Sequence, residues 1–103
     1  MTISAQTRKL LWGRAQDVCS FAMCWQALTA DEVDARTGEG FAAVVGEEPH
    51  VRSGRPGGPR YDPDYPRANI DNYANVMLLC PAHRTLIDAN NGRRISSRDL
   101  GKD

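Results

Sequence analysis

This sequence shows no recognisable segment of the kinds that direct a protein into a membrane or out of the cell. No apolar run approaches a length of about 20 residues, which a helix needs to span a bilayer, and no secretory signal is recognisable. Only three cysteines are present, so they cannot all pair as disulfides. Thiols in a reducing compartment bind metal more often than they bind one another. We therefore expect a cytoplasmic protein that has no contact with a membrane and uses its cysteines as metal ligands.

Net charge and chain length narrow the possibilities further. The 13 basic and 13 acidic residues cancel, which gives no support for a nonspecific nucleic-acid binder. Arginine nevertheless dominates the basic residues of the second half. Its planar guanidinium suits phosphate, although an ordinary solvated surface explains the same composition. At 103 residues the chain is expected to form one domain, residues 1–103, either alone or as part of a longer protein.

The three cysteines and one of the two histidines fall into two close pairs, Cys19 with Cys24 and Cys80 with His83. Three thiolates and an imidazole are a ligand set for one tetrahedral zinc ion, and four protein ligands leave no open position for catalysis. The alternative is that these side chains simply pack in the core. The spacing of the pairs favours a structural zinc site.

Periodicity, capping residues and β-branched runs predict a small α+β fold. In its first half we expect a helix from about residue 5 to 17 capped by Ser4 or Thr7, a metal-binding knuckle over 18–28, a polar turn-like segment over 30–40, and a strand over 41–45 that continues through 50 and 51. In the second half we expect a Gly- and Pro-rich loop over 53–66, a turn over 69–73, a strand over 75–79, a helix from 81 to about 90, and a weak helical turn within 95–103.

His50 lies in the first expected strand, directly after two glutamates and a proline. A single histidine in a strand is more often structural than catalytic. The loop that follows raises its interest, because glycines allow close approach of the backbone to a ligand and long ordered loops are often functional. A neutral imidazole beside such a loop could take a proton from water that attacks a phosphodiester.

Three segments together resemble the HNH endonuclease family, namely residues 46–53, 56–63 and 75–83. The resemblance covers roughly residues 10–100 and closely follows the subgroup with a cysteine-rich zinc staple. It implies a ββα-metal fold made of an N-terminal helix, a two-stranded antiparallel hairpin with a long loop, and a C-terminal helix. It also implies metal-dependent hydrolysis of DNA, with a bacterial or phage defence nuclease as one setting.

The resemblance further implies roles for individual residues. His50 matches the general base, and Asn75 matches the asparagine whose side chain ties down the loop and so orients the histidine. The matching structural zinc ligands are Cys19, Cys24, Cys80 and His83. A catalytic magnesium or manganese ion is also implied. Among the arginines, we expect Arg52, Arg55 and Arg60 to bind nucleic acid.

One position departs from the family pattern. The family usually has a histidine after the last zinc ligand that helps to hold the catalytic ion, whereas this chain has Arg84. A guanidinium cannot coordinate a cation and repels one. Glu48 or Asp88 could be a substitute ligand, or Arg84 could itself contact the scissile phosphate. Alternatively, this is a degenerate copy that binds nucleic acid or a protein without cutting, or a structural zinc knuckle that mediates assembly.

The aromatic residues are expected to serve packing. We predict that four of them pack in the core or against the metal knuckle and do not serve as stacking platforms for bases, namely Trp12, Trp25, Phe41 and Tyr73.

Overall fold

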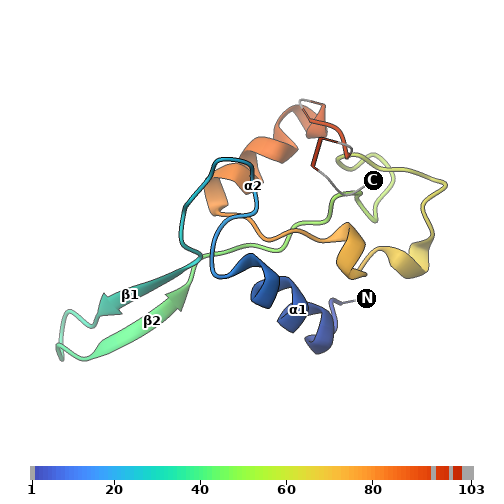
Figure 1. The fold of residues 1–103 in the computed structure, drawn as a ribbon. Helices are drawn as coiled ribbons and strands as arrows, with labels where there is room; N and C mark the ends of the chain where they lie inside the picture. The colour runs from blue at the N-terminus through green and yellow to red at the C-terminus, as the bar shows by residue number, and fades with distance from the viewer. Residues whose placement is uncertain (1, 94, 98, 101–103) are drawn as a thin grey trace.

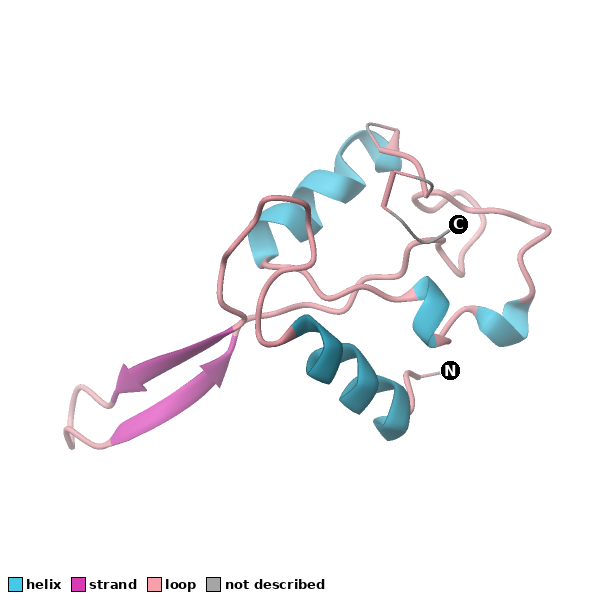
Figure 2. Cartoon of the chain, viewed as in Figure 1, coloured by secondary structure: helices cyan, strands magenta, loops and turns pink. Residues whose placement is uncertain are grey.

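The computed structural model of the chain describes residues 2–93, 95–97 and 99–100. Its helices are α1 (Ala5–Ala15) and α2 (Pro81–Asp88), and its two-stranded antiparallel sheet consists of β1 (Thr29–Val33) and β2 (Gly40–Val44). Figure 1 shows that this hairpin projects from a body that contains both helices. Most of the remaining chain is loop (Figure 2), interrupted by the short 3-10 helices η1 (Arg67–Asn69), η2 (Tyr73–Asn75) and η3 (Ala89–Gly92). The predicted α+β class is confirmed, but different residues form the hairpin.

α1 begins and ends at recognisable local signals. Ser4 caps it, because its hydroxyl oxygen accepts a hydrogen bond of 3.1 Å from the backbone N–H of Thr7. The helix ends at Ala15, since Gln16 and Asp17 adopt positive φ values of 54° and 63°. The predicted helix is therefore confirmed with a slightly earlier end. Neither α1 nor α2 has the length and apolar character that crossing a membrane requires.

The segment predicted to be turn-like contains a strand. β1 pairs with β2 so that Thr29 lies opposite Val44 and Val33 lies opposite Gly40, and only residues 34–39 form the turn. The prediction for 30–40 is therefore wrong for its first residues. The side chains of β1 are mostly exposed, so the strand carries no alternation of buried and exposed residues that the sequence could display.

The pairing predicted between residues 41–51 and 75–79 is present only in part. Two isolated antiparallel bridges join Glu47 to Leu79 and His50 to Val76. Pro49 interrupts the ladder between them because it has no N–H, although its carbonyl oxygen accepts a hydrogen bond of 3.0 Å from Met77. Two short bridges therefore replace the continuous hairpin that the sequence predicts here.

The core lies beneath these bridges. Residues 76–80 are buried along their whole length and pack with Leu28, Val51 and Ile87, each of which is fully buried. Complete burial of one such aliphatic side chain stabilises a protein by about 1.5–3 kcal/mol. The core therefore fixes residues 76–80, which include Val76, the bridge partner of His50, and end at Cys80.

The aromatic residues divide between the core and the surface. Trp12 and Tyr73 pack against the core, as predicted. Trp25 and Phe41 are 81% and 51% exposed, so the prediction that they pack against the core or knuckle is wrong. Trp25 lies in the irregular knuckle, and Phe41 lies in β2, whose side chains are mostly exposed.

α2 begins where the sequence indicates. Pro81 occupies its first turn, where the absence of a backbone N–H removes no intrahelical bond. The helix ends at Asp88, close to the predicted end, and Asn90 and Asn91 follow with positive φ values of 54° and 56°. The predicted turn within 95–103 lies partly outside the described residues.

Glu48 joins α1 to the segment that carries His50. Its carboxylate accepts hydrogen bonds of 2.8 Å from both Nε and Nη2 of Arg8 and of 2.9 Å from Nε1 of Trp12. The bond from Arg8 lowers the pKa of Glu48 and outweighs burial, and the Trp12 N–H adds to this effect. The folded pKa therefore lies below that of the unfolded chain, which is about 4.3. The contact stabilises the fold above that pH and its contribution is lost as the pH falls through the folded pKa.

We expect Glu48→Gln to lower the free energy of unfolding at pH 7 by about 1 kcal/mol, the value of one hydrogen bond and a screened ion pair. The difference from wild type should shrink as the pH falls below about 4. Denaturant unfolding at several pH values measures it, with Glu32→Gln on exposed β1 as the control. The same pH dependence for both variants would contradict the stabilising contact.

Candidate functional site

The four predicted metal ligands come together in space. The three cysteine Sγ atoms and Nδ1 of His83 all lie within 4.8 Å of one another. His83 Nδ1 lies 3.3 Å from Sγ of Cys80 and 3.8 Å from Sγ of Cys19. Around a tetrahedral zinc ion, a sulfur and a nitrogen ligand lie about 3.6 Å apart. The group therefore fits a structural metal such as zinc.

Neighbouring residues hold this group in place. Cys80 and His83 lie at the start of α2, so one helical turn sets their separation. In the knuckle, the ring of Phe21 stacks on the His83 imidazole at 4.2 Å between centroids, with 7° between the planes. The backbone N–H of Ser20 donates a 2.9 Å hydrogen bond to Leu78, which ties the knuckle to the buried run. Ser20 and Phe21, which lie between Cys19 and Cys24, thus hold the knuckle and the His83 ring in position.

Burial and hydrogen bonding act on the thiols in opposite directions. Burial raises the pKa of the Cys19 thiol to about 11. Burial also acts to raise the pKa of Cys80, but hydrogen bonds from the backbone of His83 and from the other two thiols lower it below its ordinary value. Negative charge, which a thiol ligand for a soft cation must carry, is therefore placed more readily on Cys80 than on Cys19.

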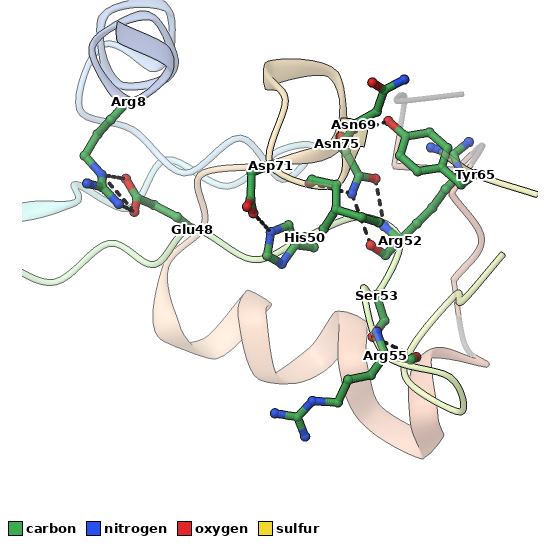
Figure 3. A network of polar contacts seen from close by, with 11 residues as sticks. Arg8, Glu48, His50, Arg52, Ser53, Arg55, Tyr65, Asn69, Asp71 and Asn75 are labelled. Carbon is green, nitrogen blue, oxygen red and sulfur yellow. Dashed lines mark hydrogen bonds and ion pairs between the residues drawn. The ribbon is translucent and has the colours of Figure 1, made fainter. Parts of the chain in front are cut away.

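His50 makes a contact that the sequence did not indicate. Its Nε2 lies 2.7 Å from Oδ1 of Asp71, and the side chain of Asp71 is only 15% exposed (Figure 3). An ionised carboxylate can only accept, so this contact requires the ring proton on Nε2 and leaves the lone pair on Nδ1. Asp71 lies in the irregular turn between η1 and η2, where no periodicity links it to His50.

The side chain of Asn75 binds the backbone of two neighbouring segments. Its side chain is fully buried, and Nδ2 donates to the carbonyl oxygens of Arg52 at 3.1 Å and Ile70 at 2.9 Å. Its Oδ1 accepts a 3.0 Å hydrogen bond from the backbone N–H of Arg52 (Figure 3). Asn75 thereby joins the chain after His50 to the turn that carries Asp71. A part in catalysis remains a prediction.

A shallow pocket of about 110 Å³ brings His50 together with Arg84 and Asp88, and Pro49, Ser53 and Pro59 complete its lining. The guanidinium of Arg84 donates from Nη1 to Oε1 of Glu47 at 2.7 Å and from Nε to Oδ2 of Asp88 at 3.2 Å. Three of the residues predicted from the sequence thus share one pocket. Glu47 was not predicted as a site residue.

Arg60 is nearly buried, and its guanidinium is bonded within the protein. Its side chain is 5% exposed and donates to the carbonyl oxygens of Val51 at 2.6 Å and Ile87 at 2.8 Å, and to Oδ1 of Asp88 at 2.8 Å. The predicted contact with nucleic acid is therefore corrected, because buried donors that are already bonded cannot reach a phosphate. Arg60 instead joins the loop to α2.

The other two arginines of the predicted nucleic-acid-binding set lie nearer to the surface. Arg55 is exposed on the loop, and Figure 3 shows its side chain pointing away from His50. The guanidinium of Arg52 lies over the ring of Tyr65, 4.7 Å from its centroid. Both remain predicted contacts for a nucleic acid.

The acidic side chains near His50 do not fit a catalytic magnesium or manganese ion, which needs several oxygen ligands. Glu48 is held by Arg8 and Trp12, and Asp71 by His50. Asp88 lies between two guanidinium groups, and Arg84 also binds Glu47. Within the described residues, the only group of three or more potential ligands is the cysteine and histidine cluster.

A scan against protein-family models finds none that matches this chain. A search of curated proteins also finds no match. Membership of the HNH family therefore remains a proposal that depends on the residues themselves.

Proposed function

We propose that this chain is a zinc-stapled, HNH-type nuclease domain that hydrolyses DNA phosphodiesters with His50 as general base. One observation carries the proposal: the His50 ring is oriented by Asp71 and lines a pocket that also contains the Arg84 guanidinium. A base whose ring is fixed by a carboxylate, next to a group suited to phosphate, is the arrangement that hydrolysis requires.

In the proposed reaction, Nδ1 of His50 accepts a proton from water while the water oxygen bonds to phosphorus. The bond from phosphorus to the leaving oxygen breaks, and that oxygen takes a proton from solvent. Asp71 then stabilises the imidazolium ion, as a carboxylate does for the histidine of a hydrolytic triad. The family resemblance implies a magnesium or manganese ion, but the nearby carboxylates are already bonded to Arg60, Arg84 and His50.

The cysteine and histidine cluster is proposed to hold zinc in a structural role. Four protein ligands complete a tetrahedral shell and leave no position for water, so this ion would take no part in the reaction. Its ligands come from the knuckle and from α2, so it would hold the N-terminal part of the chain against the helix that carries Arg84.

The function is tested by incubating purified, zinc-loaded protein with supercoiled plasmid and separating relaxed from supercoiled forms. We expect nicked circles to accumulate with time and with protein concentration. Single-stranded DNA and RNA are tested in parallel to define the substrate. Failure to cut any of these, by protein that is folded and contains zinc, would contradict the proposal.

The second candidate function is binding of nucleic acid without cleavage. It is favoured by the ion pairs of Arg84, whose guanidinium is held by two carboxylates at the place where the family has a metal ligand. Fluorescence anisotropy with labelled DNA distinguishes the two functions, because a degenerate copy should bind DNA without cutting it under any condition.

We expect Asp71→Asn to lower the rate of cleavage by about 10²–10⁴-fold, because the amide can turn its NH₂ group toward Nε2 and favour the wrong tautomer. Initial nicking rates measure the effect. The ¹⁵N chemical shifts of the His50 ring report the tautomer directly, and a merely structural role for Asp71 would not change them. Asn72→Ala, in the next position, is the control. An unchanged tautomer and rate would show that Asp71 does not position the base.

A further inference from the structure

We infer that Arg84 is the cation of the His50 pocket and that a phosphate is held there by its guanidinium, with Asp88 as a positioning residue and Glu47 as the partner that the phosphate replaces. This inference rests on the proposed function for the identity of the substrate, but it concerns binding and can be tested without cleavage. It also assigns Glu47, which no sequence motif indicated, to the site.

Arg84 is anchored firmly at its backbone and from two sides at its guanidinium. Its N–H donates to the carbonyl oxygen of Cys80 at 2.9 Å in the first turn of α2. Glu47 approaches from the segment that pairs with Leu79, and Asp88 lies one helical turn further along α2. A guanidinium has five N–H donors. The hydrogen bonds that Arg84 makes with the described part of the chain use two of them, so three remain for a ligand. With 42% of its side chain exposed, Arg84 presents them at the pocket.

Asp88 is the fixed partner of Arg84. The nearly buried Arg60 donates to Oδ1 of Asp88 and also holds the loop and the end of α2 through two carbonyl oxygens. Arg60 therefore sets the position of Asp88, whose other oxygen accepts from Arg84. The single negative charge of Asp88 is shared between Arg60 and Arg84. Asp88 therefore orients the guanidinium of Arg84 without fully neutralising its positive charge.

Glu47 is the exchangeable partner. Its side chain is 39% exposed, and an ion pair with that much solvent contact contributes little to stability. A phosphate carries more negative charge and more acceptor oxygens than a carboxylate, so it can replace Glu47 at Nη1 at little cost. Asp88 would keep its hold on Nε during this exchange, which leaves the guanidinium facing the same pocket.

A divalent ion would require the same two carboxylates. The guanidinium already lies between Glu47 and Asp88, and its charge repels a second cation. Arg84 and a metal ion are therefore alternative occupants of one position. The wild-type pocket holds the arginine, and removal of the arginine should convert it into a cation site.

The test uses the zinc-loaded chain of 103 residues and inorganic phosphate as the probe, with binding followed by NMR through the Arg84 Nε–H and the His50 ring. Arg84→Ala should weaken phosphate binding at least about tenfold, the loss of one charge-assisted contact. Glu47→Gln should strengthen it, because the competing carboxylate is gone. The controls are Arg36→Ala and Glu39→Gln in the exposed hairpin turn, which should change nothing.

Manganese supplies the second measurement, by electron paramagnetic resonance. Wild-type protein should bind no manganese at the pocket, whereas Arg84→His should bind one ion and broaden the signals of His50 and Asp88. Phosphate binding that is insensitive to Arg84, or wild-type protein that binds manganese beside His50, would overturn the inference. If Arg84→Ala fails to fold, the opposite shift expected for Glu47→Gln still decides. If phosphate binds as expected and DNA is not cut, the proposed function fails and this inference stands.

Discussion

His50→Ala is expected to abolish DNA nicking while leaving the fold intact. Removal of a general base typically lowers a rate by about 10²–10⁴-fold, and by more where no other group can take the proton. The side chain is 35% exposed, and the bridge from residue 50 to Val76 is made by the backbone, so little packing is lost. Nicking rates measured beside thermal unfolding and zinc content separate loss of the base from loss of structure.

A histidine variant can also be tested by chemical rescue. Imidazole added to the alanine variant should restore part of the activity, because the cavity left beside Asp71 accepts a ring of that size. Val44→Ala on the exposed face of β2 serves as the control and should keep wild-type activity. Cleavage by the alanine variant at the wild-type rate would place the base elsewhere.

Loss of the metal is expected to unfold the protein. Apparent binding free energies of structural zinc sites are about 10–16 kcal/mol at pH 7, which is comparable to or larger than the total stability of about 5–15 kcal/mol of a typical domain. Cys80 is buried and joins the core run directly to α2, so Cys80→Ser removes a ligand and leaves a polar group in the core. Aggregated or largely unfolded protein is expected.

The measurements are elemental analysis for zinc and circular dichroism before and after treatment with a strong chelator. Trp25→Ser is the matched control, since this residue follows Cys24 directly but is 81% exposed. That variant should keep both its zinc and its thermal transition. Cooperatively folded wild-type protein without any bound metal would contradict a structural zinc site.

The parts of the molecule that the sequence predicted are those set by local rules. A hydroxyl before α1 and a proline in the first turn of α2 act on their own neighbours, so the helices were found close to their observed bounds. The cluster of possible metal ligands was found because its cysteines and histidine lie in two pairs of short spacing.

The features that the sequence did not predict depend on partners far along the chain. Asp71 reaches His50 only because the chain returns to the segment of His50 through residues 67–75, which contain two short helical turns. Arg60 was expected at the surface because arginine in a loop usually is, but a left-handed φ of 55° and two buried carbonyl oxygens turn it inward. β1 is a strand because β2 pairs with it, and its own side chains do not indicate this.

The attachment of the hairpin has a consequence for how the molecule opens. The carbonyl oxygen of Leu28 accepts hydrogen bonds from both Val45 and Gly46, at 2.9 and 3.0 Å, so both strands leave the body at one point. β1 and β2 beyond it extend away from both helices (Figure 1). Their amides can exchange with solvent by opening of the hairpin alone, whereas the amides of Met77 and Leu79 are released only when the core opens. His50, Arg84 and the cysteine and histidine cluster thus share one cooperative unit from which the hairpin is largely independent.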